Sequence, residues 1–139
     1  MANPVIKTLT IDGTSMDNNL NLLFYDKKTQ NYSANTQTNT ASVTITTKGT
    51  YVFDYENDYK AGSVTGGRLV QSTLVDSDGA ALSIQSQRAN NQWGVVVSGS
   101  VTAHITQVPA TFTLRAYTEQ ACSNNVAWLR ARLVIPGDA

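Results

Sequence analysis

The chain has little cysteine, little charge and no long apolar run, and each shortage excludes a class of protein. Its single cysteine, Cys122, excludes an intrachain disulfide and favours a protein that folds in a reducing cytoplasm. Ten basic residues balance ten acidic ones, which argues against a nucleic-acid partner. No apolar run approaches the roughly 20 residues of a membrane-spanning helix, so we expect no membrane insertion. The first ten residues also lack the apolar centre of a signal peptide.

Residues that carry out catalysis are also scarce. His104 is the only histidine, and no Ser-His-Asp or Cys-His spacing can be built around it. Cys122 has no cation beside it in sequence to lower its pKa, so we expect a small buried side chain. Asp54, Glu56 and Asp58 could suggest a glycosidase, but the sequence offers no cause for a raised pKa. We therefore predict that the protein is not an enzyme and has no catalytic residue and no cofactor.

What the chain does have is a period-two alternation of apolar and polar residues, which is typical of β-strands. Thr and Val are abundant, and no window has the pattern of an amphipathic helix. The alternation predicts strands over residues 5–11, 20–25, 41–47, 48–58, 67–75, 81–86, 93–106, 110–117 and 126–135. We therefore predict one all-β domain over residues 1–139, an antiparallel β-sandwich with eight or nine strands.

Polar segments predict the connections. The segment 27–40 predicts a long surface loop, and the pairs Asn90-Asn91 and Asn124-Asn125 predict two more. The sequence Asp-Ser-Asp-Gly at 76–79 predicts a hairpin turn. It also resembles the start of a calcium loop, but the twelfth position holds Gln87 where such a loop needs a glutamate. We therefore predict no metal site there.

The segment KGTYVFDYEND, residues 48–58, is unusual because acidic residues alternate with large aromatic ones. In a strand Phe53 and Tyr55 lie on one face, and Asp54 and Glu56 lie on the other. The aromatic face belongs in a core. The acidic face needs a partner that this segment does not itself identify.

From Asn31 onward the order of features resembles the C1q domain, a relative of the tumour necrosis factor (TNF) jelly roll. Gly49, Tyr51 and Phe53 match the Gly-x-Tyr-x-Phe motif of that family, and residues 110–117 and 127–135 lie where its last two strands lie. The resemblance implies a C1q/TNF-like jelly roll that forms a homotrimer, with its inner sheet around the threefold axis. In that sheet the motif strand and the final strand are neighbours. The implied interface residues are Asp54, Glu56, Trp128, Arg130 and Arg132, with the acids beside the arginines.

The scarcity of cysteine and the Thr/Asn-rich composition resemble those of a bacteriophage tail-needle or tail-fibre knob. We therefore expect a non-enzymatic trimeric binding module, on a virion or outside cells, that contacts a glycan or protein receptor on a host surface. Two alternatives remain open: a capsid decoration or stabilising protein, and a soluble bacterial lectin. Aromatic rings next to Asn, Gln and Ser suit carbohydrate binding. The candidate ligand-binding residues are Tyr32, Tyr59, Arg88, Asn91 and Trp93, although Trp93 could instead begin a strand and cap the core.

Overall fold

The computed structural model of the chain describes residues 22–60, 67–89 and 95–137. These residues form no helix, and hence none that could cross a membrane. They form eight strands: β1 (Leu23–Tyr32), β2 (Thr38–Ile45), β3 (Gly49–Tyr59), β4 (Arg68–Val75), β5 (Ala81–Ala89), β6 (Val95–Ile105), β7 (Ala110–Thr118) and β8 (Cys122–Pro136). The all-β class expected from the period-two pattern is confirmed.

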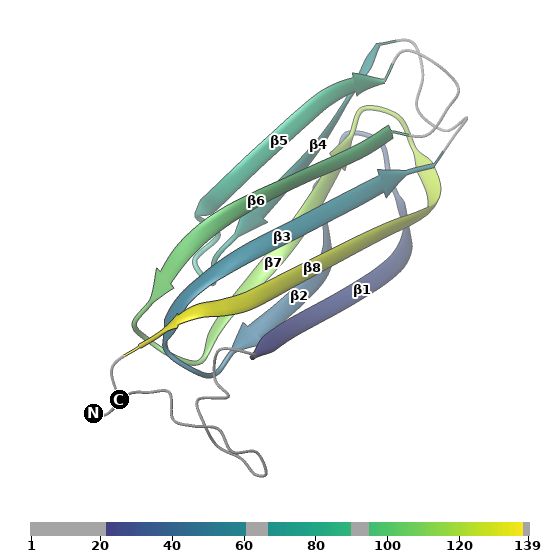
Figure 1. Ribbon diagram of the computed structural model, residues 1–139. Coiled ribbons are helices and arrows are strands. Elements are labelled where there is room, and N and C mark those ends of the chain that lie inside the picture. Colours follow the sequence, from purple (N-terminus) through teal and green to yellow (C-terminus); the bar gives the residue numbers. More distant parts are fainter. Residues whose placement is uncertain (1–21, 61–66, 90–94, 138–139) are drawn as a thin grey trace.

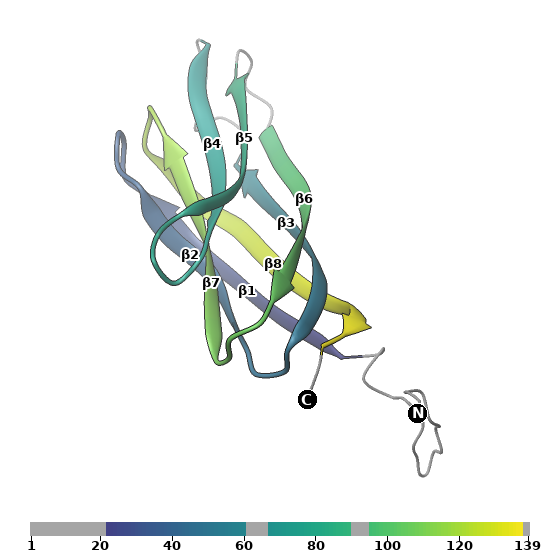
Figure 2. The same cartoon turned by 90° about the vertical axis from the view of Figure 1, so that its left-hand side faces the viewer.

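Two antiparallel sheets of four strands pack face to face (Figures 1 and 2). Sheet A has the strand order β1-β8-β3-β6, and sheet B has the order β2-β7-β4-β5. The chain crosses from one sheet to the other at every connection except the β4–β5 hairpin. This is the strand arrangement of a jelly roll, so the predicted fold is confirmed.

The core lies between the sheets and is rich in aromatic rings. Every second residue of β3 is buried, from Gly49 to Tyr59, because one face of that strand looks into the sandwich. Phe53 of β3 packs on Phe112 of β7, with ring centroids 4.7 Å apart. Tyr51 contacts Phe24 of β1 edge to face. These contacts join both sheets through the aromatic face predicted for residues 48–58.

Gly49, the first residue of the motif, is required by a close approach of β3 to β8. A Cβ atom there would lie 2.5 Å from Leu133 Cδ1 and 2.6 Å from the carbonyl oxygen of Ile135. Its φ of 150° is also one that residues with a side chain rarely adopt. The motif glycine therefore lets the central strand pack against the final one.

The predicted surface loop over residues 27–40 is wrong. β1 continues to Tyr32 and β2 begins at Thr38, so only residues 33–37 connect the two strands. The side chains of β1 from Asp26 to Asn31 are polar, but β1 is an edge strand whose backbone is held by pairing with β8. The polar side chains of this segment thus indicate exposure to solvent and not the absence of a strand.

The predicted loop at Asn124-Asn125 is also wrong, because both residues lie within β8. Asn124 has a φ of 57°, and the pairing with β1 changes register between Gln30 and Tyr32. Asn125 is fully buried, and its amide nitrogen donates to the carbonyl oxygens of Cys122 and Gln30. Its side chain therefore supplies hydrogen bonds where the regular ladder is interrupted.

The hairpin predicted at residues 76–79 is confirmed between β4 and β5. The Asp76 carboxylate accepts hydrogen bonds from the backbone N–H groups of Asp78 and Ala80, and Gly79 has a φ of 83°. The strand predicted over 5–11, and the predicted loop at Asn90-Asn91, lie outside the described residues.

Candidate functional site

The outer face of sheet A, which we call face A, points away from sheet B and carries the acidic residues of β3. Neighbouring strands place their outward side chains in rows across this face. One row, from β1 to β6, is Tyr25, Arg130, Asp54 and Ser100, and the next is Lys27, Trp128, Glu56 and Ser98. Acidic, basic, aromatic and hydroxyl groups therefore meet on one sheet surface.

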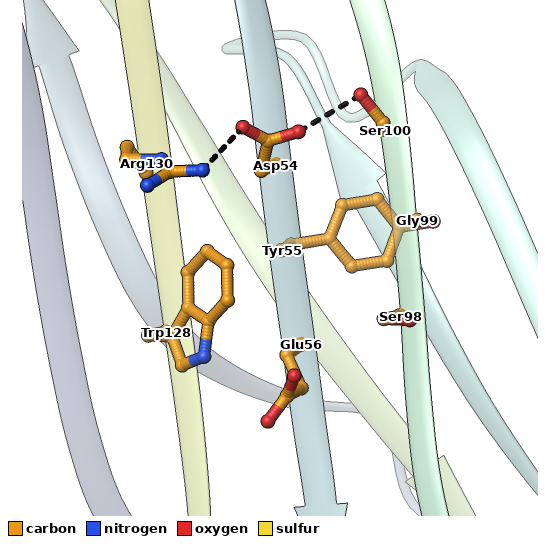
Figure 3. A pocket seen from close by; sticks show the side chains of 8 residues that line it. All are labelled: Asp54, Tyr55, Glu56, Ser98, Gly99, Ser100, Trp128 and Arg130. Atoms are coloured by element: carbon orange, nitrogen blue, oxygen red, sulfur yellow. Dashed lines mark hydrogen bonds and ion pairs between the residues drawn. The ribbon is translucent and has the colours of Figure 1, made fainter.

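Asp54 is the best-bonded acid of face A. Its Oδ2 lies 2.8 Å from Nη2 of Arg130, and its Oδ1 accepts a hydrogen bond from the Ser100 hydroxyl at 2.9 Å (Figure 3). Partial burial alone would raise the pKa of the carboxyl. The hydrogen bonds from Arg130 and Ser100 and the charges of Arg130 and Arg132 outweigh burial, so the pKa of Asp54 lies below its usual value. Asp54 is therefore held as a carboxylate.

Trp128 lies beside this ion pair. The Arg130 guanidinium carbon is 5.6 Å from the centroid of the Trp128 ring, and the Tyr25 ring lies 6.4 Å away on the other strand. The Arg130 Nε–H is buried and has no hydrogen-bond partner in the described part of the chain. The Arg130 guanidinium thus contacts the Trp128 ring and bonds Asp54, but the described residues leave its Nε–H without an acceptor.

A shallow hollow of about 450 Å³ opens next to Trp128 on face A. Figure 3 shows Asp54 and Arg130 on one side of it and Glu56 and Ser98 on the other. The Glu56 carboxylate makes no hydrogen bond or ion pair with any other residue in the described ranges. The hollow therefore presents an unpaired carboxylate beside an indole ring, which is suited to a cationic group.

Gly99 of β6 and Tyr55 of β3 form the inner wall of this hollow. The Tyr55 ring passes beneath Gly99 to reach Ser83 of β5, where the two hydroxyls lie 2.7 Å apart. A Cβ on residue 99 would lie 2.4 Å from the Tyr55 hydroxyl oxygen, so only glycine fits. Tyr55 thereby joins β3 of sheet A to β5, an edge strand of sheet B.

The sequence matches no protein-family model and no curated protein. By structure the chain is similar to the PRD1 vertex protein P5, with a TM-score of 0.64 and 12% identity over 96% of this chain and 85% of that one. It is also similar to the globular domain of the zebrafish complement 1qA protein, with a TM-score of 0.58 and 14% identity over 83% and 98% of the two chains. Murine APRIL follows, with a TM-score of 0.53 and 9% identity over 81% and 100%.

This chain has a jelly-roll fold similar to that of the C1q and TNF-type proteins. The identities are too low to carry more than the fold. Within that fold, sheet A contains the motif strand and the final strand as neighbours, as the resemblance implied.

The jelly roll confirms part of the predicted charge pairing on face A. Asp54 does lie opposite Arg130, and the two form an ion pair. Glu56 lies opposite Trp128 and Arg132 lies opposite Val52, so these two charges do not face each other across neighbouring strands, and their pairing across subunits stays a prediction. A strand register that places one acid beside an arginine places the next acid beside the tryptophan two residues away.

The predicted ligand-binding role of Tyr32 and Tyr59 assumed exposed rings, and that assumption is wrong. Tyr32 is 2% exposed and Tyr59 is fully buried, with their ring centroids 5.5 Å apart in a second core cluster of the jelly roll. Arg88 is exposed, donates to the Gly67 carbonyl oxygen at 2.9 Å and lies 3.9 Å from the Glu119 carboxylate. The predicted residues Asn91 and Trp93 lie outside the described residues.

Sequence reasoning missed a polar network inside the jelly roll. The Tyr32 hydroxyl donates to Asn57 Oδ1 at 2.7 Å, and Asn57 Nδ2 donates to the Ser72 hydroxyl oxygen at 2.8 Å. All three side chains are buried, and they join β1 and β3 of sheet A to β4 of sheet B. A signal was present: Asn57 shares the parity of Tyr55 and Tyr59 on β3, which is the buried face.

The two residues weighed for catalysis have structural contacts. His104 is exposed, and its Nδ1 lies 2.8 Å from the Thr50 hydroxyl oxygen of the facing strand. Cys122 is buried, as predicted, and its thiol lies 2.7 Å from Asn125 Oδ1. Among the described residues, no three His, Cys, Asp or Glu side chains gather in a way that could hold a metal ion.

Proposed function

We propose that this chain is a non-enzymatic binding module that assembles as a homotrimer on the surface of a virion, with face A around the threefold axis. One observation carries the proposal. Of the five large apolar side chains that the described residues expose, four lie on the strands of sheet A: Leu23, Tyr25, Val96 and Ile135. Apolar side chains exposed mainly on one sheet favour a contact of that sheet with another protein surface.

The outward direction of Leu23, Tyr25 and Val96 follows from strand alternation, whereas Ile135 pairs with Thr50 beyond a register shift in β8. Leu23 and Tyr25 alternate with Phe24, which packs on the core residue Tyr51. Val96 lies between Val95 and Val97, which are both buried. The apolar residues therefore flank the polar centre of face A formed by Asp54 and Arg130.

The resemblance in fold supports the number of copies. The C1q/TNF-like resemblance implies a trimer whose inner sheet surrounds the axis, and sheet A is the sheet that holds the motif strand. Each trimer carries three copies of every loop that contacts the receptor. Three weak contacts made together then bind a host surface far more tightly than one.

Mass in solution tests the proposal. Light scattering after size-exclusion chromatography should give about 45 kDa, three times the 15.0 kDa of one chain. Ile135→Glu should reduce this mass, because it places a charge in the contact. Ile84→Glu is the matched control: Ile84 is 54% exposed on sheet B, against 59% for Ile135 on sheet A, and its substitution should leave the mass unchanged. A monomeric wild-type protein would refute the trimer.

Two roles on a virion fit this assembly, and each is supported by one structural similarity. The jelly roll of C1q and TNF type supports a receptor-binding knob at a tail tip, with Arg88, Asn91 and Trp93 as the remaining candidate contacts. The similarity to the PRD1 vertex protein P5 over 96% of the chain supports a structural role at a capsid vertex. Labelled trimer that binds intact host cells supports the first role. Binding only to capsids stripped of their vertices supports the second.

A lectin role has lost its main support, because Tyr32 and Tyr59 are buried and cannot stack on a sugar.

A further inference from the structure

The charges of face A are divided between its two sides. Within the four strands of sheet A, the outward-facing basic residues lie on β1 and β8, and they are Lys27, Arg130 and Arg132. The outward-facing acidic residues all lie on β3, and they are Asp54, Glu56 and Asp58. Face A therefore has a basic half on β1 and β8 and an acidic half on β3, which lie side by side across the strands.

Only the pair at the boundary between the halves is formed within the chain. Asp54 and Arg130 face each other across β3 and β8 at 2.8 Å. Lys27, Arg132, Glu56 and Asp58 make no ion pair with any other residue of the described ranges. Lys27 and Glu56 lie in the same row of face A but on opposite sides of β8, with Trp128 between them. Both halves thus retain charges that are free to meet another surface.

A ring of three identical chains brings these halves together. In such a ring each copy contacts the next head to tail, so one side of its face meets the opposite side of the neighbour's face. Rotation about an axis along the strands keeps residues of one row at the same height. The acidic half of one copy then meets the basic half of the next, and the row that holds Glu56 meets the row that holds Lys27.

We propose that Lys27 of each protomer enters the hollow beside Trp128 of the neighbouring protomer and pairs there with Glu56. The hollow offers the Glu56 carboxylate for the ammonium group and the Trp128 ring for the lysine stem and charge. Trp128 is already flanked by Arg130 on one side, so the lysine contacts the side that borders Glu56. The site is complete only when a second copy supplies its lysine. This inference rests on the proposed trimer.

Charge reversal tests the pair. Glu56→Lys and Lys27→Glu should each raise the protomer concentration at which half the trimer dissociates, by on the order of tenfold or more, because like charges then meet at all three contacts. Arg68→Glu, an exposed site on sheet B, is the control and should leave that concentration unchanged. Circular dichroism shows whether each variant is folded. If a reversed variant does not fold, Glu56→Gln and Lys27→Gln replace it, and each should weaken the dependence of the trimer on salt.

Mixing the two reversed proteins separates a contact between chains from one within a chain. In a mixed ring of two Glu56→Lys chains and one Lys27→Glu chain, two of the three contacts again join opposite charges. Native mass spectrometry should therefore find mixed trimers at concentrations where neither variant forms trimers alone. A pair within one chain cannot be restored by mixing, so the absence of mixed trimers would overturn the inference.

The inference and the proposed function fail in different ways. A wild-type trimer that is unaffected by either reversal would overturn the pairing of Lys27 with Glu56 and leave the trimer standing. A wild-type monomer or dimer would overturn both.

Discussion

The buried link between Tyr32 and Asn57 should contribute measurably to stability, and a double-mutant cycle can isolate it. Asn57→Ala removes two hydrogen bonds, of 2.7 and 2.8 Å, from a fully buried site. It leaves the Tyr32 hydroxyl, in a side chain that is 2% exposed, without its acceptor. An unsatisfied buried polar group costs about 1–3 kcal/mol, so with the lost packing we expect Asn57→Ala to cost about 2–4 kcal/mol.

The second variant, Tyr32→Phe, removes only the hydroxyl and keeps the ring contact with Tyr59 at 5.5 Å. On its own it should cost about 1–2 kcal/mol, because it leaves Asn57 Oδ1 without a donor. In the Asn57→Ala background the hydroxyl has no acceptor to lose. The double variant should therefore cost less than the sum of the two single variants, by about 1 kcal/mol or more.

Urea unfolding followed by tryptophan fluorescence measures these free energies, at one fixed protomer concentration because assembly raises apparent stability. Tyr117→Phe is the control: its hydroxyl bonds Asn35 at 3.2 Å on the surface, and its loss should change stability by less than about 0.5 kcal/mol. Single-variant effects that simply add, within about 0.5 kcal/mol, would show that the two side chains are not coupled.

Three further predictions follow from the packing and the ionisable groups. Gly49→Ala should lower the free energy of unfolding by at least about 1–3 kcal/mol, because its Cβ would lie 2.5 Å from Leu133 Cδ1. Gly67→Ala is the control and should cost less, because its Cβ would meet nothing within 4 Å. Equal costs in thermal or urea unfolding would contradict the close-approach argument. Burial raises the pKa of Tyr59 to about 12. The contribution of Tyr59 to folding stability should therefore be fully present below the unfolded pKa near 10 and should fall as pH rises towards about 12. Tyr59→Phe should reduce this alkaline loss of stability. The pKa of Asp54 is lowered in the folded chain, because Arg130 and Ser100 outweigh the effect of burial. Its contribution to folding stability is therefore present above about pH 4 and is lost as pH falls through the folded pKa. Asp54→Asn should remove that part of the acid dependence of stability, and an unchanged acid profile would count against the ion pair.

The sequence predicts those parts of the fold that depend on local alternation. In β3 the aromatic residues alternate strictly with polar ones, so Tyr51 and Phe53 were assigned to the core and Asp54 to the opposite face, as the structure has them. The hairpin at residues 76–79 was also predictable, because the Asp76 side chain forms its hydrogen bonds within the turn. Both features involve residues close together in the chain.

The errors arise where partners distant in sequence decide the outcome. β1 has no apolar alternation after Asp26, and it is a strand because β8, about a hundred residues later, pairs with it. The polar sequence neighbours of Tyr32 and Tyr59 predict exposed rings. In the folded chain both rings pack in a core cluster, where Asn57 Oδ1 and the Gln71 carbonyl oxygen accept hydrogen bonds from their hydroxyls. Strand register likewise decided that Glu56 faces Trp128 and not an arginine.

The position of β8 in sheet A has a consequence for synthesis on the ribosome. β8 is the last strand in the sequence, yet it lies between β1 and β3 and pairs with both. Until residues 122–136 have left the exit tunnel, β1 has no partner in its sheet and one edge of β3 is open. Sheet A therefore forms only after translation of the whole domain, and the nascent chain exposes pairing edges that chaperones would need to protect from neighbouring nascent chains.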